Sequence, residues 1–329
     1  MADFFVTKLK LSQIDDIIRL VYMENKSEIF ESYRGPLLSL SYRMLGSLSE
    51  AEDVVQDVAI SWLEQDASEL RNPKSWLIRV CTNKAIDYLK KAYKKREVYS
   101  GTWLPDAIPD SLITWETDLE RKESLSTSFL ILLENLSPKE RAVYILRKVF
   151  EYSSSETSCF LEISDSSCRK IHERACKKID ERENKYSKNH EKSFELLEEF
   201  FSLACSGSKE EITDILHSES EFWSDGGGKA SAVSRILYEP VAISVFFANV
   251  FSKLPIDSKE YKLEYVFVNS SPGIVLSKID INLLWNIETI FTFEVKEDRI
   301  ARIYAQRNPD KLSILNYHLK GQNNHCLGG

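Results

Sequence analysis

Residues 49–65 read SEAEDVVQDVAISWLEQ, and residues 72–96 read NPKSWLIRVCTNKAIDYLKKAYKKR. In the first stretch, apolar residues recur every three or four positions, which predicts an amphipathic helix with one buried face. Ser49 begins a capping-box pattern, so we expect the helix to start there. Its exposed face would carry Asp53, Gln56, Asp57 and Glu64. This helix is therefore predicted to offer a carboxylate-rich docking surface.

The second stretch predicts a helix with a basic exposed face. Asn72 is a good N-cap, and Pro73 suits the first helical turn. The polar residues of this helix include Arg79, Asn83, Lys84, Lys90, Lys91, Lys94, Lys95 and Arg96. Such a face suits a phosphate backbone, and an asparagine is able to read a base edge. One helix is expected to meet a basic partner and the next an acidic one.

The combination of AEDVVQD, the Asn-Pro pair, SWL and TNKAIDYL resembles region two of bacterial sigma factors of the extracytoplasmic-function class, over residues 27–96. The resemblance implies that Asp53, Gln56 and Asp57 dock on the clamp helices of the largest subunit of core RNA polymerase. It also implies that the following loop and basic helix separate the strands of promoter DNA. The residues that would meet the downstream promoter element are Arg71, Asn72, Trp76, Arg79, Asn83 and Lys84. Trp76 either walls a pocket for a flipped base or belongs to the core.

Composition predicts a folded chain of two or three domains, since 329 residues are 43% hydrophobic and 29% charged. We expect a cytoplasmic protein without membrane contact, because no apolar run reaches the roughly 18 residues of a membrane span. The net charge of −8 argues against nonspecific coating of nucleic acid. Basic residues nevertheless concentrate in 84–96 and 169–188. The six cysteines form no CxxC pair, so no metal site or disulfide framework is expected.

Beyond a linker at residues 99–122, a second DNA-binding domain is predicted. Ser137 begins a capping box with proline in the first turn, and Ser164 is placed to cap a final basic helix. This helix-turn-helix pattern resembles region four of the same sigma factors. The resemblance implies that the upstream promoter element meets Arg169, Lys170, Arg174 and Lys177. Glu162 stands where the family usually has glycine.

The last third predicts an α+β cone, because helices precede several β-branched and aromatic strand patterns. It resembles the SnoaL-like branch of the fold of nuclear transport factor two. TWLPD, DGGGK and NPDKL together resemble one subgroup, sigma factors with a fused SnoaL-like C-terminal domain. That resemblance implies an intramolecular regulatory contact between the C-terminal domain and the sigma domains. The contact set would be Trp103, Leu104, Pro105, Asp225, Gly226, Gly227, Gly228, Lys229, Asn308, Pro309, Asp310, Lys311 and Leu312.

The expected organisation is a multidomain chain with two all-α domains ahead of the α+β domain. The predicted parts are an N-terminal extension (1–24), sigma region two (25–98), the linker (99–122), sigma region four (123–186), the SnoaL-like domain (190–312) and a C-terminal tail (313–329). The predicted function is promoter-specific transcription initiation, regulated in cis, with no catalytic residue and no cofactor. Two alternatives stay open. One is an enzyme with a polar pocket around Asp225 or His217, and the other is a DNA-binding regulator whose C-terminal domain senses a ligand.

Overall fold

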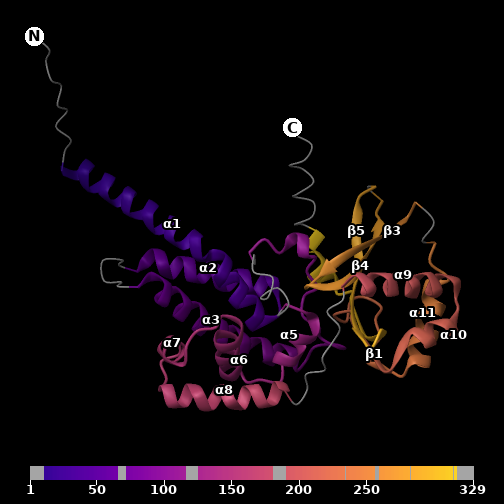
Figure 1. Cartoon of the computed structure of the whole chain (residues 1–329). Coiled ribbons are helices and arrows are strands. Elements are labelled where there is room, and N and C mark those ends of the chain that lie inside the picture. The colour runs from indigo at the N-terminus through magenta and orange to yellow at the C-terminus, as the bar shows by residue number, and fades with distance from the viewer. Residues whose placement is uncertain are drawn as a thin grey trace, which may run out of the picture.

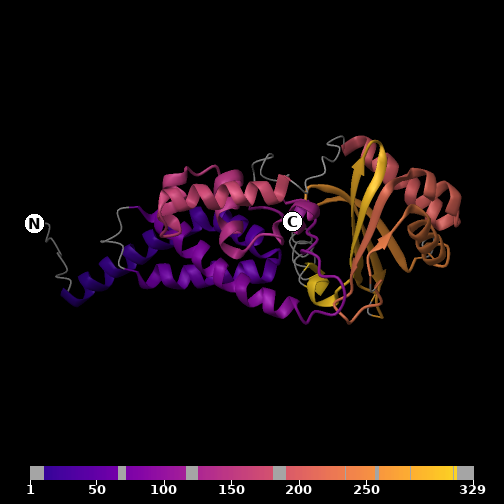
Figure 2. The ribbon, with the colours of Figure 1, turned by 90° about the horizontal axis from the view of Figure 1, so that it is seen from below.

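The computed structural model describes residues 11–65, 72–115, 125–180, 190–233, 235–255, 259–281, 283–313 and 315–316. Two helical domains lie together at one end of the molecule, and a sheet domain lies at the other (Figure 1). In the view turned by 90°, linker residues 99–115 run between the helical domains and one face of the sheet (Figure 2). The predicted fold class, two all-α domains followed by an α+β domain, is confirmed. Among the described residues, no helix is long and apolar enough to cross a bilayer.

The first helical domain consists of α1 (Leu11–Leu45), α2 (Leu48–Glu64) and α3 (Pro73–Arg96). α1 continues through Pro36, although a proline inside a helix costs about 3 kcal/mol. Buried side chains on both sides of the proline, such as Phe30 and Leu37, pack in the core and offset that cost.

The start of α2 differs from the prediction. The helix begins at Leu48 with Ser47 as the N-cap, and Ser47 makes no side-chain capping bond. Instead the carboxylate of Asp106, in the linker, accepts a hydrogen bond from the Leu48 amide at 2.7 Å. A distant acid thus satisfies one of the free amides of the helix N-terminus.

The second helical domain consists of α5 (Thr127–Leu133), α6 (Pro138–Tyr144), a π-helical turn (Ile145–Val149), α7 (Ser154–Phe160) and α8 (Asp165–Asp180). The predicted capping box at Ser137 is present, and the hydroxyl of Ser164 accepts a hydrogen bond from the Ser167 amide at 3.2 Å. α7 and α8 form the predicted helix-turn-helix. Glu162, in the turn between them, has φ +52°, a conformation that favours glycine.

The C-terminal domain contains α9 (His190–Ser206), α10 (Lys209–Ile215) and α11 (Pro240–Phe251). Its six-stranded sheet has the order β2-β1-β6-β5-β4-β3. The strands are β1 (Leu216–Asp225), β2 (Leu237–Tyr238), β3 (Tyr261–Val268), β4 (Ser271–Ile279), β5 (Trp285–Lys296) and β6 (Arg299–Gln306). β1 runs parallel to β6, and the other pairs are antiparallel.

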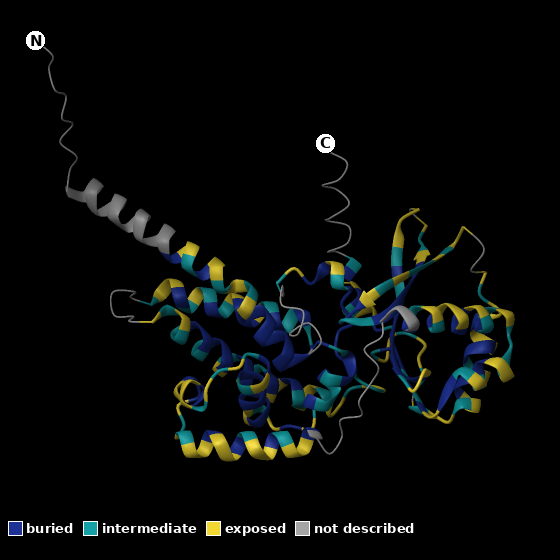
Figure 3. Ribbon diagram, in the orientation of Figure 1, coloured by how far each residue is buried: buried dark blue, intermediate teal, exposed yellow. Residues whose placement is uncertain are grey.

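The sheet packs on both faces. The helices of the C-terminal domain cover one face and enclose a core rich in phenylalanine, such as Phe200, Phe247 and Phe293. The opposite face supplies Val268 and Ile290 to a cluster that continues through the linker into both helical domains. Figure 3 shows the dense buried region where these parts meet. The linker, with the short 3-10 helix η2 (Asp110–Leu112), is therefore part of a packed interface.

Candidate functional site

The acidic face of α2 is open to solvent. Asp53 and Gln56 are exposed, and Asp57 is half-buried. Asp57 accepts a hydrogen bond from the hydroxyl of Tyr88 on α3 at 3.2 Å, which orients its carboxylate. Val54, Val55 and Val58 of the same helix are buried, as the periodicity predicts. The helix therefore presents two carboxylates and an amide outward from a fixed backbone.

The basic face of α3 is partly occupied by the second helical domain. Arg79 forms an ion pair with Glu162 at 2.9 Å, between α3 and the turn of the helix-turn-helix. Asn83 is exposed and Lys84 is half-buried. Because Glu162 takes the Arg79 guanidinium, that side chain is engaged within the protein in this arrangement.

The loop before α3 serves the helix itself. The side chain of Asn72 caps α3 by accepting a hydrogen bond from the Ser75 amide at 3.1 Å. Trp76 is half-buried and packs against Trp62 with 5.5 Å between ring centroids. Its partial exposure is compatible with both predicted roles. Arg71 lies outside the described residues.

The basic side chains of α8 lie on one exposed face. Cys168, Ala175 and Ile179 anchor the opposite face in the core. Lys170, Arg174 and Lys177 border a shallow hollow of about 460 Å³. The four predicted residues Arg169, Lys170, Arg174 and Lys177 are exposed, as is Lys178, which pairs with Glu140 at 2.8 Å. This face is open to solvent, although Arg169 is paired with Asp165 of its own helix.

The three predicted interdomain motifs come together around one buried carboxylate. We call the contacts of residues 99–106 with Asp225–Lys229 and Asn308–Leu312 the linker-docking site. Asp225, at the end of β1, is fully buried. It accepts hydrogen bonds from the hydroxyl of Tyr99 at 2.6 Å and from the amide of Leu104 at 3.1 Å. Lys311 neutralises it from 2.9 Å, so the buried charge has a full set of partners.

Asn308 and Lys311 hold the linker from the other side. The Asn308 amide group donates to the hydroxyl of Tyr99 at 2.7 Å, and Lys311 also donates to the carbonyl of Leu104. Burial, together with Asp225, raises the pKa of Tyr99, so its hydroxyl keeps its proton at neutral pH. Tyr99 is therefore a central residue of the site that the sequence reasoning did not identify.

Trp103 is held between two cations. The Arg96 guanidinium lies 3.5 Å and the Lys311 ammonium 4.5 Å from the centroid of its ring. Such cation–π contacts favour this position of the ring. Pro105 is buried, and its carbonyl accepts a hydrogen bond from Gln306 at 3.4 Å. The TWLPD segment thus docks by its ring and by its backbone.

The glycines of DGGGK allow the close approach of the NPDKL segment. Gly227 has φ +61°, and a Cβ atom there would overlap with the Asn308 side chain. Gly228 has φ +69° and lies beside Ser100 of the linker, and Gly226 is packed against Ala230. A side chain at Gly227 would displace Asn308 from Tyr99.

The remaining motif residues have smaller parts. Lys229 pairs with Asp310 at 2.6 Å on the surface, which links the two loops of the C-terminal domain. Pro309 is exposed, and Leu312 is buried in the large core cluster. Neither Pro309 nor Asp310 makes a polar contact with residues 99–115, the described part of the linker.

A second anchor fixes the linker further along the chain. The carbonyl of Asp106 accepts hydrogen bonds from Tyr42 of α1 at 2.7 Å and from Asn269 at 2.9 Å. Asn269, between β3 and β4, also accepts from the Ile108 amide at 3.1 Å. Burial raises the pKa of Asp106, although Lys311 opposes this. One linker residue thus joins the first helical domain to the C-terminal domain.

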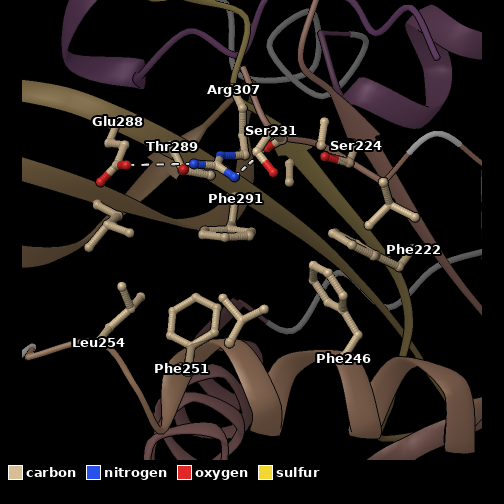
Figure 4. A pocket seen from close by; sticks show the side chains of 15 residues that line it. Phe222, Ser224, Ser231, Phe246, Phe251, Leu254, Glu288, Thr289, Phe291 and Arg307 are labelled. Carbon is tan, nitrogen blue, oxygen red and sulfur yellow. Dashed lines mark hydrogen bonds and ion pairs between the residues drawn. The ribbon is translucent and has the colours of Figure 1, made fainter. Parts of the chain in front are cut away.

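The C-terminal domain also contains an apolar pocket of about 270 Å³ (Figure 4). Four phenylalanines line it, and Arg307 and Glu288 lie at one side. Neither Asp225 nor His217 lines this pocket. His217 is buried, and its ring accepts a hydrogen bond from the Glu219 amide. Within the described part of the chain, no cluster of acid, histidine and cysteine side chains suits a metal ion.

Comparisons with known proteins agree with this arrangement. Residues 29–95 match the family model of sigma-70 region 2, and residues 128–179 match that of sigma-70 region 4. The ECF RNA polymerase sigma factor SigJ of Mycobacterium tuberculosis is 27% identical over 209 residues, which cover 63% of this chain and 67% of that protein. The ECF RNA polymerase sigma factor SigW of Bacillus subtilis is 28% identical over 151 residues, or 42% of this chain and 77% of that one.

The fold match covers all three domains. The crystal structure of the Mycobacterium tuberculosis extracytoplasmic-function sigma factor SigJ superposes with a TM-score of 0.66 at 22% identity. The match covers 87% of this chain and 98% of that chain. The order and packing of two helical domains and an α+β domain are therefore shared with a solved structure.

Proposed function

The chain belongs to the extracytoplasmic-function class of the sigma-70 family, and from this premise we propose that its C-terminal domain regulates it in cis by holding the linker. As a member of this family, the protein is an RNA polymerase sigma factor that directs promoter-specific transcription initiation. Its partners are core RNA polymerase and promoter DNA, which also supports a cytoplasmic location.

The linker-docking site is the observation that carries the regulatory proposal. A polar linker between two DNA-binding domains has no need of buried partners, yet this one supplies Tyr99, Leu104 and Asp106 to buried hydrogen bonds. Unpaired buried polar groups are costly, so each of these contacts favours the docked linker. They favour one closed arrangement in which the C-terminal domain holds the linker.

The closed arrangement restrains both helical domains. The second domain inserts Arg141, fully buried, toward the first, where its Nε donates to the carbonyl of Arg43 at 3.1 Å. Arg96, at the end of α3, pairs with Glu134 at 2.6 Å and stacks on Trp103. Release of the linker would therefore remove support from the contact between the two DNA-binding domains. A differential binding energy of about 5.5 kcal/mol is enough to reverse such a balance from 1:99 to 99:1.

The exposed faces support the other roles. We assign polymerase docking to Asp53, Gln56 and Asp57, the downstream element to the loop and α3 residues from Arg71 to Lys84 predicted above, and the upstream element to the exposed face of α8. In this arrangement Glu162 competes with DNA for the guanidinium of Arg79. We assign no catalytic step to the C-terminal domain, because Asp225 is committed to the linker and His217 lies outside the apolar pocket.

Charge reversal on α2 tests the polymerase-binding role. Asp53→Lys with Asp57→Lys should abolish binding to core polymerase, because two exposed carboxylates become cations on the docking face. Glu210→Lys with Asp214→Lys, at the same spacing on α10, is the matched control and should bind like the wild type. Equal binding by all three proteins would refute the assignment.

Truncation tests the regulation. A chain that ends before Asn308 loses Asn308 and Lys311, so its run-off transcription with core polymerase should differ from that of the full chain without any added ligand. Identical transcripts and yields would exclude regulation in cis by this segment.

A further inference from the structure

We propose that the apolar pocket of the C-terminal domain binds a small apolar monocarboxylate, and that this binding loosens the linker-docking site. The first part concerns a ligand site and stands independently. The second part rests on the regulatory role proposed above.

The walls of the pocket select an apolar body. Phe222, Phe246, Phe251 and Phe291 surround a volume of about 270 Å³, with Leu254 at the side (Figure 4). This volume is close to the lower end of the roughly 300–1,000 Å³ that small-molecule sites occupy. Four aromatic rings favour a phenyl ring or a short hydrocarbon chain over a polar metabolite.

One edge of the Arg307 guanidinium selects a carboxylate. Its Nη1 donates to the carbonyl of Ser231, and its Nη2 lies 3.6 Å from Glu288. Its Nε is buried without a hydrogen-bond partner. A carboxylate is able to accept from Nε and Nη2 together, in the bidentate geometry that arginine favours. An alcohol has one uncharged oxygen, so it would accept from only one of these two donors and without the charge.

The pocket and the linker-docking site lie back to back on the same two strand ends. Ser224 lines the pocket, and the next residue, Asp225, holds the linker. Arg307 lines the pocket, and the next residue, Asn308, holds Tyr99. The amide of Arg307 also donates to the carbonyl of Asp225 at 2.8 Å. A shift of Arg307 is therefore transmitted to both linker-binding side chains.

The bond from Arg307 to Ser231 gives the direction of the effect. Ser231 belongs to the loop that follows β1 and carries Gly226–Lys229. A carboxylate that draws the guanidinium away from Ser231 removes a tie on this loop, and with it support for Asn308. Ligand binding and linker docking then oppose each other, and by linkage the effect is reciprocal.

Titration calorimetry of the full chain tests the site with two matched probes, 4-phenylbutyrate and uncharged 4-phenyl-1-butanol. The carboxylate should bind the wild type at least tenfold more tightly than the alcohol. Arg307→Gln should remove this preference, and Leu254→Trp, which fills the pocket from its half-exposed side, should weaken both probes. Failure of 4-phenylbutyrate to bind the wild type, or equal affinity in all three proteins, would overturn the proposal.

The coupling is tested with the same probe and a variant outside the pocket. Tyr99→Phe releases the linker without touching the pocket lining, so its affinity for 4-phenylbutyrate should rise several-fold. Tight binding by the wild type with the same affinity in Tyr99→Phe would keep the ligand site and refute its coupling to the linker. Failure of the regulatory role is thereby distinguished from failure of the site.

Discussion

Replacement of Tyr99 by phenylalanine removes one atom from the centre of the linker-docking site. The hydroxyl donates to the buried carboxylate of Asp225 at 2.6 Å and accepts from Asn308 at 2.7 Å. The ring keeps its shape, so packing is unchanged. Asn308 is 5% exposed, and its amide group would lose this partner.

The structure gives the size of the effect. Tyr99→Phe removes a hydrogen bond to the carboxylate of Asp225 and leaves the buried amide group of Asn308 without this partner. Together these losses should lower the free energy of linker docking by about 2–3 kcal/mol. Each 1.4 kcal/mol is tenfold in an equilibrium constant, so the undocked population should increase roughly 30- to 150-fold. The C-terminal domain itself keeps its Lys311–Asp225 ion pair and should stay folded.

Amide hydrogen exchange measures this population directly, because the Leu104 amide is protected by Asp225. Protection at Leu104 should fall by the same factor in Tyr99→Phe, while amides in the centre of β5 keep theirs. Tyr238→Phe, on an exposed tyrosine of β2, is the matched control. Unchanged protection at Leu104 in a folded Tyr99→Phe variant would refute the account of the linker-docking site.

Further predictions concern backbone and charge. Gly227→Ala should lower both the melting temperature and the exchange protection of the Leu104 amide, because the new Cβ atom would overlap with Asn308. Gly101, at φ +85°, has open space around it, so Gly101→Ala should lose only the roughly 1–2 kcal/mol of stability that a left-handed backbone costs a residue with a side chain. Burial raises the pKa of Glu294 to about 7. Between about pH 4.5, the ordinary pKa, and about pH 7, the native carboxyl group keeps its proton while that of the unfolded chain is ionised. The free energy of unfolding should therefore fall as pH rises through this range and then level off. In Glu294→Gln, thermal unfolding should lack this pH dependence, and a pH profile identical to that of the wild type would contradict the assignment. Glu162→Gly should stabilise the helix-turn-helix by about 1 kcal/mol, because glycine adopts φ +52° without strain and the lost ion pair with Arg79 is exposed and weak. The gain should appear as slower amide hydrogen exchange in α7 and α8.

Local patterns were sufficient for much of the helical part. The apolar period of α2 predicts its buried valines, and Asn72 with Pro73 predicts the start of α3. The start of α2 could not be predicted in this way, since Asp106, distant in the sequence, supplies the capping carboxylate. The uninterrupted path of α1 through Pro36 likewise depends on tertiary packing.

The strands and the linker show a similar division. β4 and β5 follow from their β-branched and aromatic residues, but β1 was missed. Its sequence, LHSESEFWSD, is rich in polar residues, and the strand is stabilised by parallel pairing with β6 far along the chain.

The motif resemblance brought Trp103, Asp225 and Asn308 together as an expectation, but it did not point to Tyr99 or Asn269. Both lie outside the quoted motifs. Their importance comes from burial and from hydrogen bonds across domains, which no local period reveals. The one local signal is a tyrosine at the start of the linker, three residues after the basic end of α3 at Arg96.

The most direct test of regulation in cis is run-off transcription at limiting protein, on a promoter that the wild type recognises, with the wild type, Tyr99→Phe and Tyr238→Phe. If the C-terminal domain restrains the helical domains through the linker, Tyr99→Phe should give at least tenfold more transcript than the other two. Equal transcript from all three proteins, with the Leu104 amide shown to be deprotected in Tyr99→Phe, would contradict the central claim.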